Sequence, residues 1–181
     1  MTIFISGGCK NGKSTIAEDC CAALACGGPL YYIATMQAYD DEDRARIKRH
    51  QNSRAGKGFI TIEQPRDLLG CLEKSDPENG TYILDSVTAL LINEMYSPES
   101  FEADKDAGRR TAKALEQFAK SVKNAVFVSD FIYSGAERYS SYTIEYMEAL
   151  ALCDRTLAAC CDAVAEISGA LATMYKGELP I

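Results

Sequence analysis

The stretch G-G-C-K-N-G-K-S, residues 7–14, decides the fold of this chain of 181 residues. It fits the phosphate-loop pattern of a glycine, four residues and Gly-Lys-Ser, with Gly7, Gly12, Lys13 and Ser14 in the fixed places. A short apolar run precedes the stretch and helical spacing follows it, which is the context that the pattern requires. A glycine-rich loop of another kind is the alternative. We expect a site for a nucleoside triphosphate, ATP or GTP.

The residue types of the loop suit a chain of phosphates. Glycines let the backbone wrap the phosphates with its N–H groups pointing inward, and the helix that follows adds the positive end of its dipole. We expect Lys13 to reach the β- and γ-phosphates and the Ser14 hydroxyl to ligate Mg²⁺. The predicted nucleotide-binding residues of the loop are Gly7, Gly8, Cys9, Lys10, Asn11, Gly12, Lys13 and Ser14.

Composition places the chain among soluble, globular proteins. The length suits one domain spanning residues 1–181, and 47% of the residues are hydrophobic. The net charge of −7 argues against a nucleic-acid partner, because such affinity comes largely from Lys and Arg. No signal peptide and no apolar stretch long enough to cross a bilayer is visible, so we expect a cytoplasmic protein without membrane insertion.

The eight cysteines form no C-x-x-C pair, which leaves little support for a zinc site. In a cytoplasmic chain we expect most of them to be buried free thiols that act as small apolar residues. Cys9 is the exception because it lies inside the phosphate loop, where alkylation would block nucleotide binding.

Apolar runs alternate with helical patterns along the chain, which predicts an α/β fold with a mainly parallel sheet covered on both faces. We assign it to the P-loop NTPases (RecA-like), with an antiparallel edge strand near the end of the chain. The predicted strands are residues 2–6, 30–34, 59–62, 82–84, 125–129, 163–167 and 171–175. The predicted helices are residues 13–26, 40–52, 65–73, 87–95 and 142–161, with another through 115–122; residues 97–106 are predicted as a polar loop.

Two aspartates follow buried strands, and either one suits the metal. Ligands of such sheets bind beyond the carboxyl ends of the strands, where the phosphate loop, Asp85 and Asp130 would all lie. Each aspartate could instead cap a helix. We predict that Asp85 binds Mg²⁺ together with Ser14 and that it belongs to the nucleotide site.

The single histidine, His50, lies in the charged helical segment D-D-E-D-R-A-R-I-K-R-H-Q-N-S-R. A solvated surface helix is the plain interpretation, because acids lead the segment and bases end it. However, Arg46, His50 and Arg54 are spaced by four and share one helix face. Two guanidiniums that flank an imidazole suit a polyphosphate and favour the neutral, nucleophilic form of the imidazole.

Several further motifs carry a family resemblance. They are the glycine loop, Y-I-A-T at residues 32–35, D-x-E and R-I before His50 and Arg54, T-x-E ending at Glu63, residues 82–88 with Asn93, and residues 157–159, 162 and 167–169. Together they resemble the bifunctional adenosylcobinamide kinase/adenosylcobinamide-phosphate guanylyltransferases of cobalamin biosynthesis.

The resemblance implies two reactions at one nucleotide site. A γ-phosphate passes from a nucleoside triphosphate to adenosylcobinamide. His50 then attacks the α-phosphate of GTP, and the guanylyl-histidine passes GMP to adenosylcobinamide phosphate, giving adenosylcobinamide-GDP. It implies catalytic roles for His50 and Lys13, nucleotide contacts from Arg46, Arg54 and Glu63, and a homo-oligomer, a trimer.

The chain departs from the family pattern in its last third. Asp130 stands where the family has Asn, Phe131 replaces a Glu, and Asp154-Arg155 stands where Asn-Gln is expected. Tyr133, Tyr139, Tyr142 and Tyr146 occupy this region, either as ordinary helix packing or as a reshaped acceptor pocket. Two alternatives therefore stay open. One is a divergent P-loop kinase or nucleotidyltransferase with another acceptor or only one activity, and the other is a non-catalytic nucleotide-dependent switch.

Overall fold

A computed structural model describes residues 1–38, 40–96, 103–134 and 139–181 of the chain. Within helix α2 (Asp41–Arg54), the side chains of residues 46, 50, 53 and 54 also lie outside the described part.

The described strands form one sheet in the order β3-β2-β4-β5-β1-β6-β7. Neighbouring strands from β3 to β6 are parallel, and β6 pairs with β7 in antiparallel register. The expected mainly parallel sheet with an antiparallel edge strand is therefore confirmed. The strands are β1 (Thr2–Gly7), β2 (Leu30–Ala34), β3 (Phe59–Glu63), β4 (Thr81–Asp85), β5 (Asn124–Asp130), β6 (Ala163–Ser168) and β7 (Leu171–Lys176).

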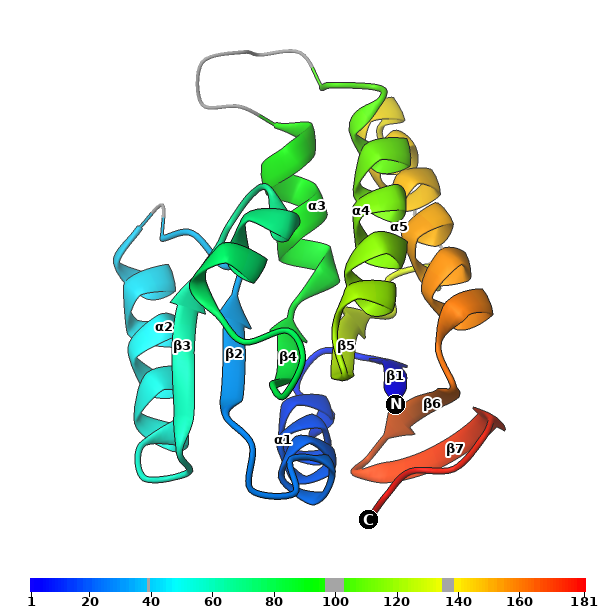
Figure 1. Cartoon of the computed structure of the whole chain (residues 1–181). Helices are drawn as coiled ribbons and strands as arrows, with labels where there is room; N and C mark the ends of the chain where they lie inside the picture. Colours follow the sequence, from blue (N-terminus) through cyan, green and yellow to red (C-terminus); the bar gives the residue numbers. More distant parts are fainter. Residues whose placement is uncertain (39, 97–102, 135–138) are drawn as a thin grey trace.

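Helices cover both faces of this sheet, and each face has its own apolar core (Figure 1). Alternate residues of β1 serve the two cores: Phe4 packs with α3, α4 and α5, whereas Ile3 and Ile5 pack with α1. The helices are α1 (Lys13–Leu24), α2, the 3₁₀ helix η1 (Leu68–Lys74), α3 (Val87–Met95), α4 (Ala107–Ser121) and α5 (Ser141–Cys160). Among the described residues, no helix has the length and apolar character needed to span a bilayer.

The largest difference from the predicted bounds is that α4 begins at Ala107, eight residues before the predicted stretch 115–122. The helix predicted at 65–73 also begins elsewhere. It is a 3₁₀ helix that begins only at Leu68, because Asp67 has a φ of 49° and the Gln64 side chain donates to the carbonyls of Arg66 and Asp67. These contacts hold the preceding residues in a turn. Most of the loop predicted at 97–106 lies outside the described residues.

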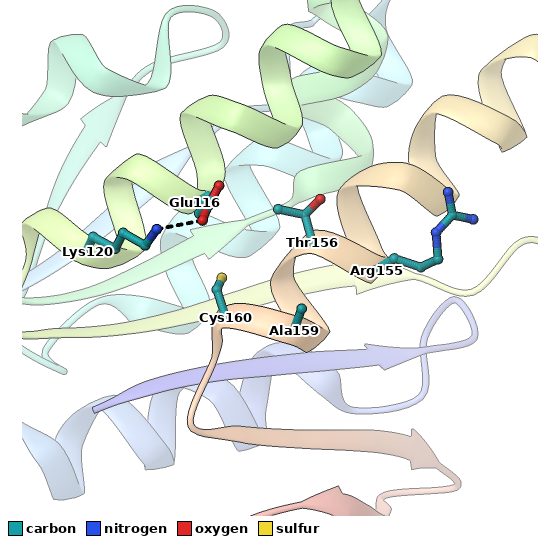
Figure 2. A pocket seen from close by; sticks show the side chains of 6 residues that line it. All are labelled: Glu116, Lys120, Arg155, Thr156, Ala159 and Cys160. Carbon is teal, nitrogen blue, oxygen red and sulfur yellow. Dashed lines mark hydrogen bonds and ion pairs between the residues drawn. The ribbon is translucent and has the colours of Figure 1, made fainter.

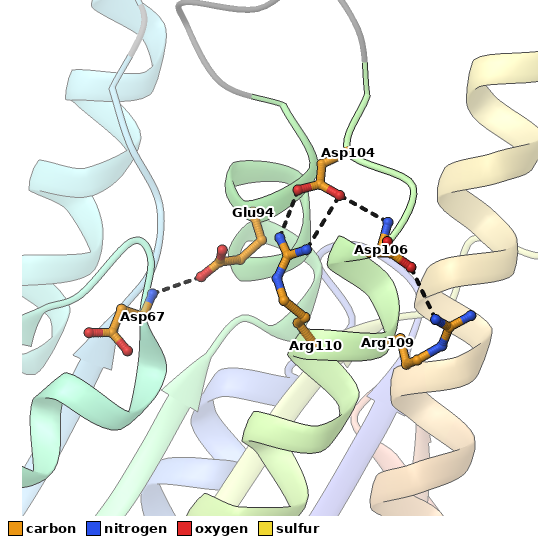
Figure 3. A network of polar contacts seen from close by, with 6 residues as sticks. All are labelled: Asp67, Glu94, Asp104, Asp106, Arg109 and Arg110. Carbon is orange, nitrogen blue, oxygen red and sulfur yellow. Dashed lines mark hydrogen bonds and ion pairs between the residues drawn. The ribbon is translucent and has the colours of Figure 1, made fainter.

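The ends of α3 and α4 are joined by a polar network (Figure 3). Arg110 donates two hydrogen bonds to the carboxylate of Asp104, at 2.8 and 3.4 Å, and the Asp104 N–H donates to the carbonyl of Met95. Glu94 accepts a hydrogen bond from the Asp67 N–H, which attaches η1 to the same end of α3. The network fixes the end of α3 that lies away from the phosphate loop.

Candidate nucleotide site

The loop between β1 and α1 has the backbone that its glycines predict. A Cβ atom on Gly7 would clash with the carbonyl oxygen of Ile167 in the neighbouring strand β6. Gly12 has a φ of 87° at the position that begins α1, a conformation that costs a side-chain-bearing residue energy. Helix α1 therefore begins at Lys13, directly after Gly12. The N–H groups of the loop lie at the positive end of the helix dipole.

Lys13 is the buried cation of this loop. Its side chain is 6% exposed, and its Nζ donates to the carbonyl oxygen of Gly8 at 2.7 Å and to Asp130 Oδ1 at 2.8 Å. An ammonium group has three N–H donors, so these two bonds use most of its capacity. Lys13 is thereby fixed over the loop, in the place where a phosphate-loop lysine acts.

Ser14 and Asp85 are brought together as the sequence suggested. The Ser14 hydroxyl donates to Asp85 Oδ2 at 2.9 Å, and the Tyr32 hydroxyl donates to the same oxygen at 2.5 Å. A hydroxyl and a carboxylate oxygen at this spacing are hard donors that suit Mg²⁺ shared with substrate phosphates. Tyr32 was missed as a site residue, although it opens the Y-I-A-T motif on the strand next to β4.

Neither aspartate acts as a helix cap, the alternative that the sequence had left open. Ser86 is the N-cap of α3 and accepts a hydrogen bond from the Ala89 N–H at 3.2 Å. Asp130 ends β5 in register with Gly7, and no described helix begins directly after it. Both carboxylates are therefore left to serve the loop, one beside Ser14 and the other beside Lys13.

The remaining predicted residues come from the edge strand β3 and from helix α2. Glu63 ends β3, is exposed, and is in register with Ala34 of β2, which is itself in register with Asp85. Arg46, His50 and Arg54 lie on α2, but their side chains are outside the described part. The described side chains of α2 are all exposed or half-buried, so this helix presents a polar surface.

A polar cluster around Asp154, in the C-terminal half of α5, was not predicted as a unit. Asp154 Oδ2 accepts a hydrogen bond from the Tyr133 hydroxyl at 2.7 Å, while Asp154 Oδ1 and Ser129 Oγ are buried without a hydrogen-bond partner among the described residues. Burial raises the pKa of Asp154, and the negative charge of Asp130 adds to the effect. Burial likewise raises the pKa of Tyr133. The cluster lies beside the Asp130 end of the site.

The tyrosines of the divergent segment do not share one environment. Tyr146 is buried in the core and donates to the carbonyl of Thr88 at 3.0 Å, whereas Tyr142 is 61% exposed. Tyr133 contacts Asp154 as described. Ordinary packing thus accounts for Tyr146, and Tyr133 is the member of the group that joins the polar cluster.

The cysteines behave as the sequence suggested. Five are buried, and burial raises the pKa of Cys20 to about 11. Cys9 is an exposed thiol within the loop. The five buried ones are Cys20, Cys21, Cys71, Cys153 and Cys161.

A surface groove of about 540 Å³ lies between the last turns of α4 and α5 (Figure 2). Both helices end where the chain enters the amino ends of β5 and β6, which is the opposite edge of the sheet from the phosphate loop. The groove is therefore separate from the candidate site. Its lining residues are Glu116, Lys120, Arg155, Thr156, Ala159 and Cys160.

A parallel sheet with this glycine loop, its buried lysine and a carboxylate at the next strand ends defines the class of phosphate-loop nucleotide-binding proteins. A solved ATPase domain has the same fold, with a TM-score of 0.51 and 7% identity over 91% of this chain and 68% of that one. At that identity the likeness concerns the fold alone.

The chain belongs to the cobinamide kinase / cobinamide phosphate guanyltransferase family, whose model matches residues 3–173. The resemblance seen in the sequence is thereby confirmed, and the family is one of transferases. The residues that depart from its pattern, Asp130 and Asp154 among them, lie within the matched range.

Three curated relatives agree with this family. The bifunctional adenosylcobalamin biosynthesis protein CobP of Pseudomonas aeruginosa is 28% identical over 98% of this chain and 99% of its own length. The bifunctional adenosylcobalamin biosynthesis protein CobU of Escherichia coli is 32% identical over 65% of this chain, and that of Salmonella typhimurium 31% over 54%. The matched part spans 61% and 51% of the lengths of these two CobU proteins.

Proposed function

We propose that this protein phosphorylates adenosylcobinamide with a nucleoside triphosphate and transfers GMP from GTP to adenosylcobinamide phosphate, giving adenosylcobinamide-GDP. The observation that carries the proposal is the joining of Lys13, Ser14 and Asp85 at one phosphate loop in a chain of this family. The names of the relatives, which place them in adenosylcobalamin biosynthesis, support the choice of acceptor.

In the kinase half, the loop residues 7–14 bind the triphosphate. The N–H groups of the loop and the Lys13 ammonium contact the phosphates. Ser14 and Asp85 would hold Mg²⁺, which would neutralise phosphate charge. The substrate hydroxyl oxygen forms a bond to the γ-phosphorus as the bond from that phosphorus to the β-phosphate oxygen breaks. Lys13 stabilises the charge that develops on the leaving diphosphate.

In the guanylyltransferase half, His50 is the nucleophile. Its imidazole nitrogen forms a bond to the α-phosphorus of GTP and pyrophosphate leaves; the phosphate of the acceptor then takes GMP from the histidine. Arg46, Arg54 and Glu63 complete the nucleotide contacts. The connectivity supports this part of the proposal, because α2 follows the carboxyl end of β2, whose last residue is in register with Asp85.

A labelling experiment tests the histidine. The protein is incubated with Mg²⁺ and GTP labelled at the α-phosphate and then denatured. We expect covalent, acid-labile label in the wild type and none in His50→Ala, while Gln51→Ala, an exposed neighbour on α2, keeps the label. A wild type that binds GTP but takes no label would show that the guanylyltransferase half is wrong.

The kinase half has its own assay. Adenosylcobinamide and γ-labelled ATP or GTP should give labelled adenosylcobinamide phosphate with wild type and His50→Ala alike. If the protein binds the triphosphate but transfers nothing to adenosylcobinamide or to adenosylcobinamide phosphate, the result would point to another acceptor or to a nucleotide-dependent switch.

We further propose a cytoplasmic homotrimer, on the strength of the family resemblance. Light scattering on the eluting protein measures the mass in solution, and a monomer of 19.7 kDa would contradict the assembly.

A further inference from the structure

The Lys13 ammonium is shared between the phosphate loop and a carboxylate. Two of its three N–H donors go to the Gly8 carbonyl and to Asp130 Oδ1. A triphosphate in the loop needs the same donors. Asp130 and a phosphate oxygen are therefore rivals for one cation.

Asp130 is not positioned to leave this place easily. Its N–H donates to Thr88 Oγ1 at 2.9 Å, and the next residue, Phe131, donates its N–H to the carbonyl of Gly7 at 2.9 Å. Thr88 is in turn held through its carbonyl by the Tyr146 hydroxyl. The backbone around Asp130 is thus attached to β1 and α3, and α5 supports the Thr88 contact, so the carboxylate stays at the end of β5 beside Lys13.

The surroundings of Asp130 offer its charge no other described cationic partner. Its carboxylate is 27% exposed and forms an ion pair with Lys13 at 2.8 Å. On the α5 side its neighbours are Tyr146 and Asp154, and its charge is one of the causes that raise the pKa of each. Lys13 is therefore the group whose availability changes most when the charge of Asp130 is removed.

We propose that Asp130 is a positioning residue that sets triphosphate affinity by competing for Lys13, so that removing its charge tightens triphosphate binding. The inference rests on the proposed nucleotide-binding function of the loop. It separates Asp130 from Asp85, since the loss of a metal-binding carboxylate weakens binding of the magnesium–triphosphate complex.

The test is the dissociation constant Kd for ATP and for GTP, measured by titration calorimetry with and without Mg²⁺. Asp130→Asn, which keeps the shape of the side chain, should lower Kd roughly tenfold, corresponding to about 1.4 kcal/mol. Asp130→Glu, which keeps the charge, should recover much of the wild-type Kd. Thermal melting of each variant verifies that it is folded.

Two further variants make the result specific. Glu116→Gln also removes a carboxylate from a lysine pair, but at the far edge of the sheet (Figure 2), and should leave Kd within about twofold. In a Lys13→Ala background, Asp130→Asn should no longer tighten binding beyond that small change. The double-mutant comparison assigns the gain to Lys13 rather than to net charge.

The possible failures are distinguishable. If the wild type binds a triphosphate and the Kd of Asp130→Asn is unchanged or higher, the inference is overturned and the proposed function stands. A gain that persists without Lys13 also overturns it. If neither wild type nor variants bind a triphosphate, the proposed function fails and the inference fails with it.

Discussion

The carboxyl ends of β4 and β5 present the same residue type to the phosphate loop and use it differently. Asp85 accepts a hydrogen bond from the Ser14 hydroxyl, whereas Asp130 forms an ion pair with Lys13. Adjacent parallel strands place the two carboxylates at one edge of the sheet, and the side chain that each meets decides its chemistry. Position in the fold alone therefore does not define a metal ligand.

What lies behind each carboxylate also differs. Behind Asp85, the Thr35 hydroxyl donates to the carbonyl of Ser86 and accepts from its N–H, while the Asn93 side chain donates to the carbonyl of Thr35. Behind Asp130 lies the Asp154 cluster, which has two buried oxygens without a described partner. The first end is closely satisfied, whereas the second keeps a buried hydroxyl and a buried carboxylate oxygen without a described partner.

The largest expected effect comes from Lys13, the buried cation of the phosphate loop. Lys13→Ala should lower kinase kcat by about 10²–10³, because a charged donor aimed at the transferring phosphate is lost. Lys113→Ala, an exposed lysine on α4, is the matched control and should keep wild-type rates. Steady-state kinetics with labelled ATP measures both; equal rates in Lys13→Ala and wild type would contradict its role.

The next effect separates the β4 end from the β5 end. Asp85→Asn should reduce activity on the order of a hundredfold at limiting Mg²⁺, and part of the loss should be recovered as Mg²⁺ is raised. A titration of rate against Mg²⁺ measures this. Should Asp85→Asn keep the wild-type Mg²⁺ dependence, Asp85 would not be the metal-binding carboxylate.

Tyr32 donates to Asp85 and Tyr133 donates to Asp154, so the loss of each hydroxyl compares how much the two regions contribute to the free energy of unfolding. Tyr133→Phe leaves the buried Asp154 carboxylate without its described donor and should cost about 1–3 kcal/mol of unfolding free energy. Tyr32→Phe leaves Asp85 with the Ser14 hydroxyl and should cost only about 0.5–1.5 kcal/mol. Urea denaturation of both variants tests the order, which the reverse result would contradict.

The smallest expected effect is a dependence on pH. Burial, with help from the charge of Asp130, raises the pKa of Asp154, so the folded state holds this proton more tightly than the unfolded chain. Its stabilising contribution is therefore fully present below the ordinary pKa of about 4 and is lost as pH rises through the raised value. Asp154→Asn should lose less stability than wild type over that window.

Asp162 supplies a control of opposite sign. The hydrogen bond from the Thr2 N–H lowers the pKa of Asp162, so its contribution is present above about 4 and is lost as the pH falls through the lowered value. Asp162→Asn should therefore flatten the acid side of the stability curve instead. Identical pH profiles for the two variants would contradict these assignments.

The sequence predicted the fold and the phosphate loop because both depend on local patterns. Apolar runs identified each described strand to within about two residues, and fixed spacing placed Lys13 and Ser14 beside a carboxylate. The pairing of Lys13 with Asp130 was not predictable, since it joins residues 117 positions apart through the crossover of two parallel strands. Tyr32 and the Asp154 cluster were missed for the same reason, because side-chain contacts between elements leave no period in the sequence.

The close approach of β6 to the loop makes the C-terminal hairpin part of the nucleotide site's mechanical support. Besides the contact at Gly7, the turn between β6 and β7 donates the Ala170 N–H to the carbonyl of Asn11 at 3.2 Å. Residues far from the loop in the sequence thus touch it directly. A fluorophore carried on exposed Ser168 would sit next to the loop without entering it, which makes this hairpin a natural optical reporter of nucleotide arrival.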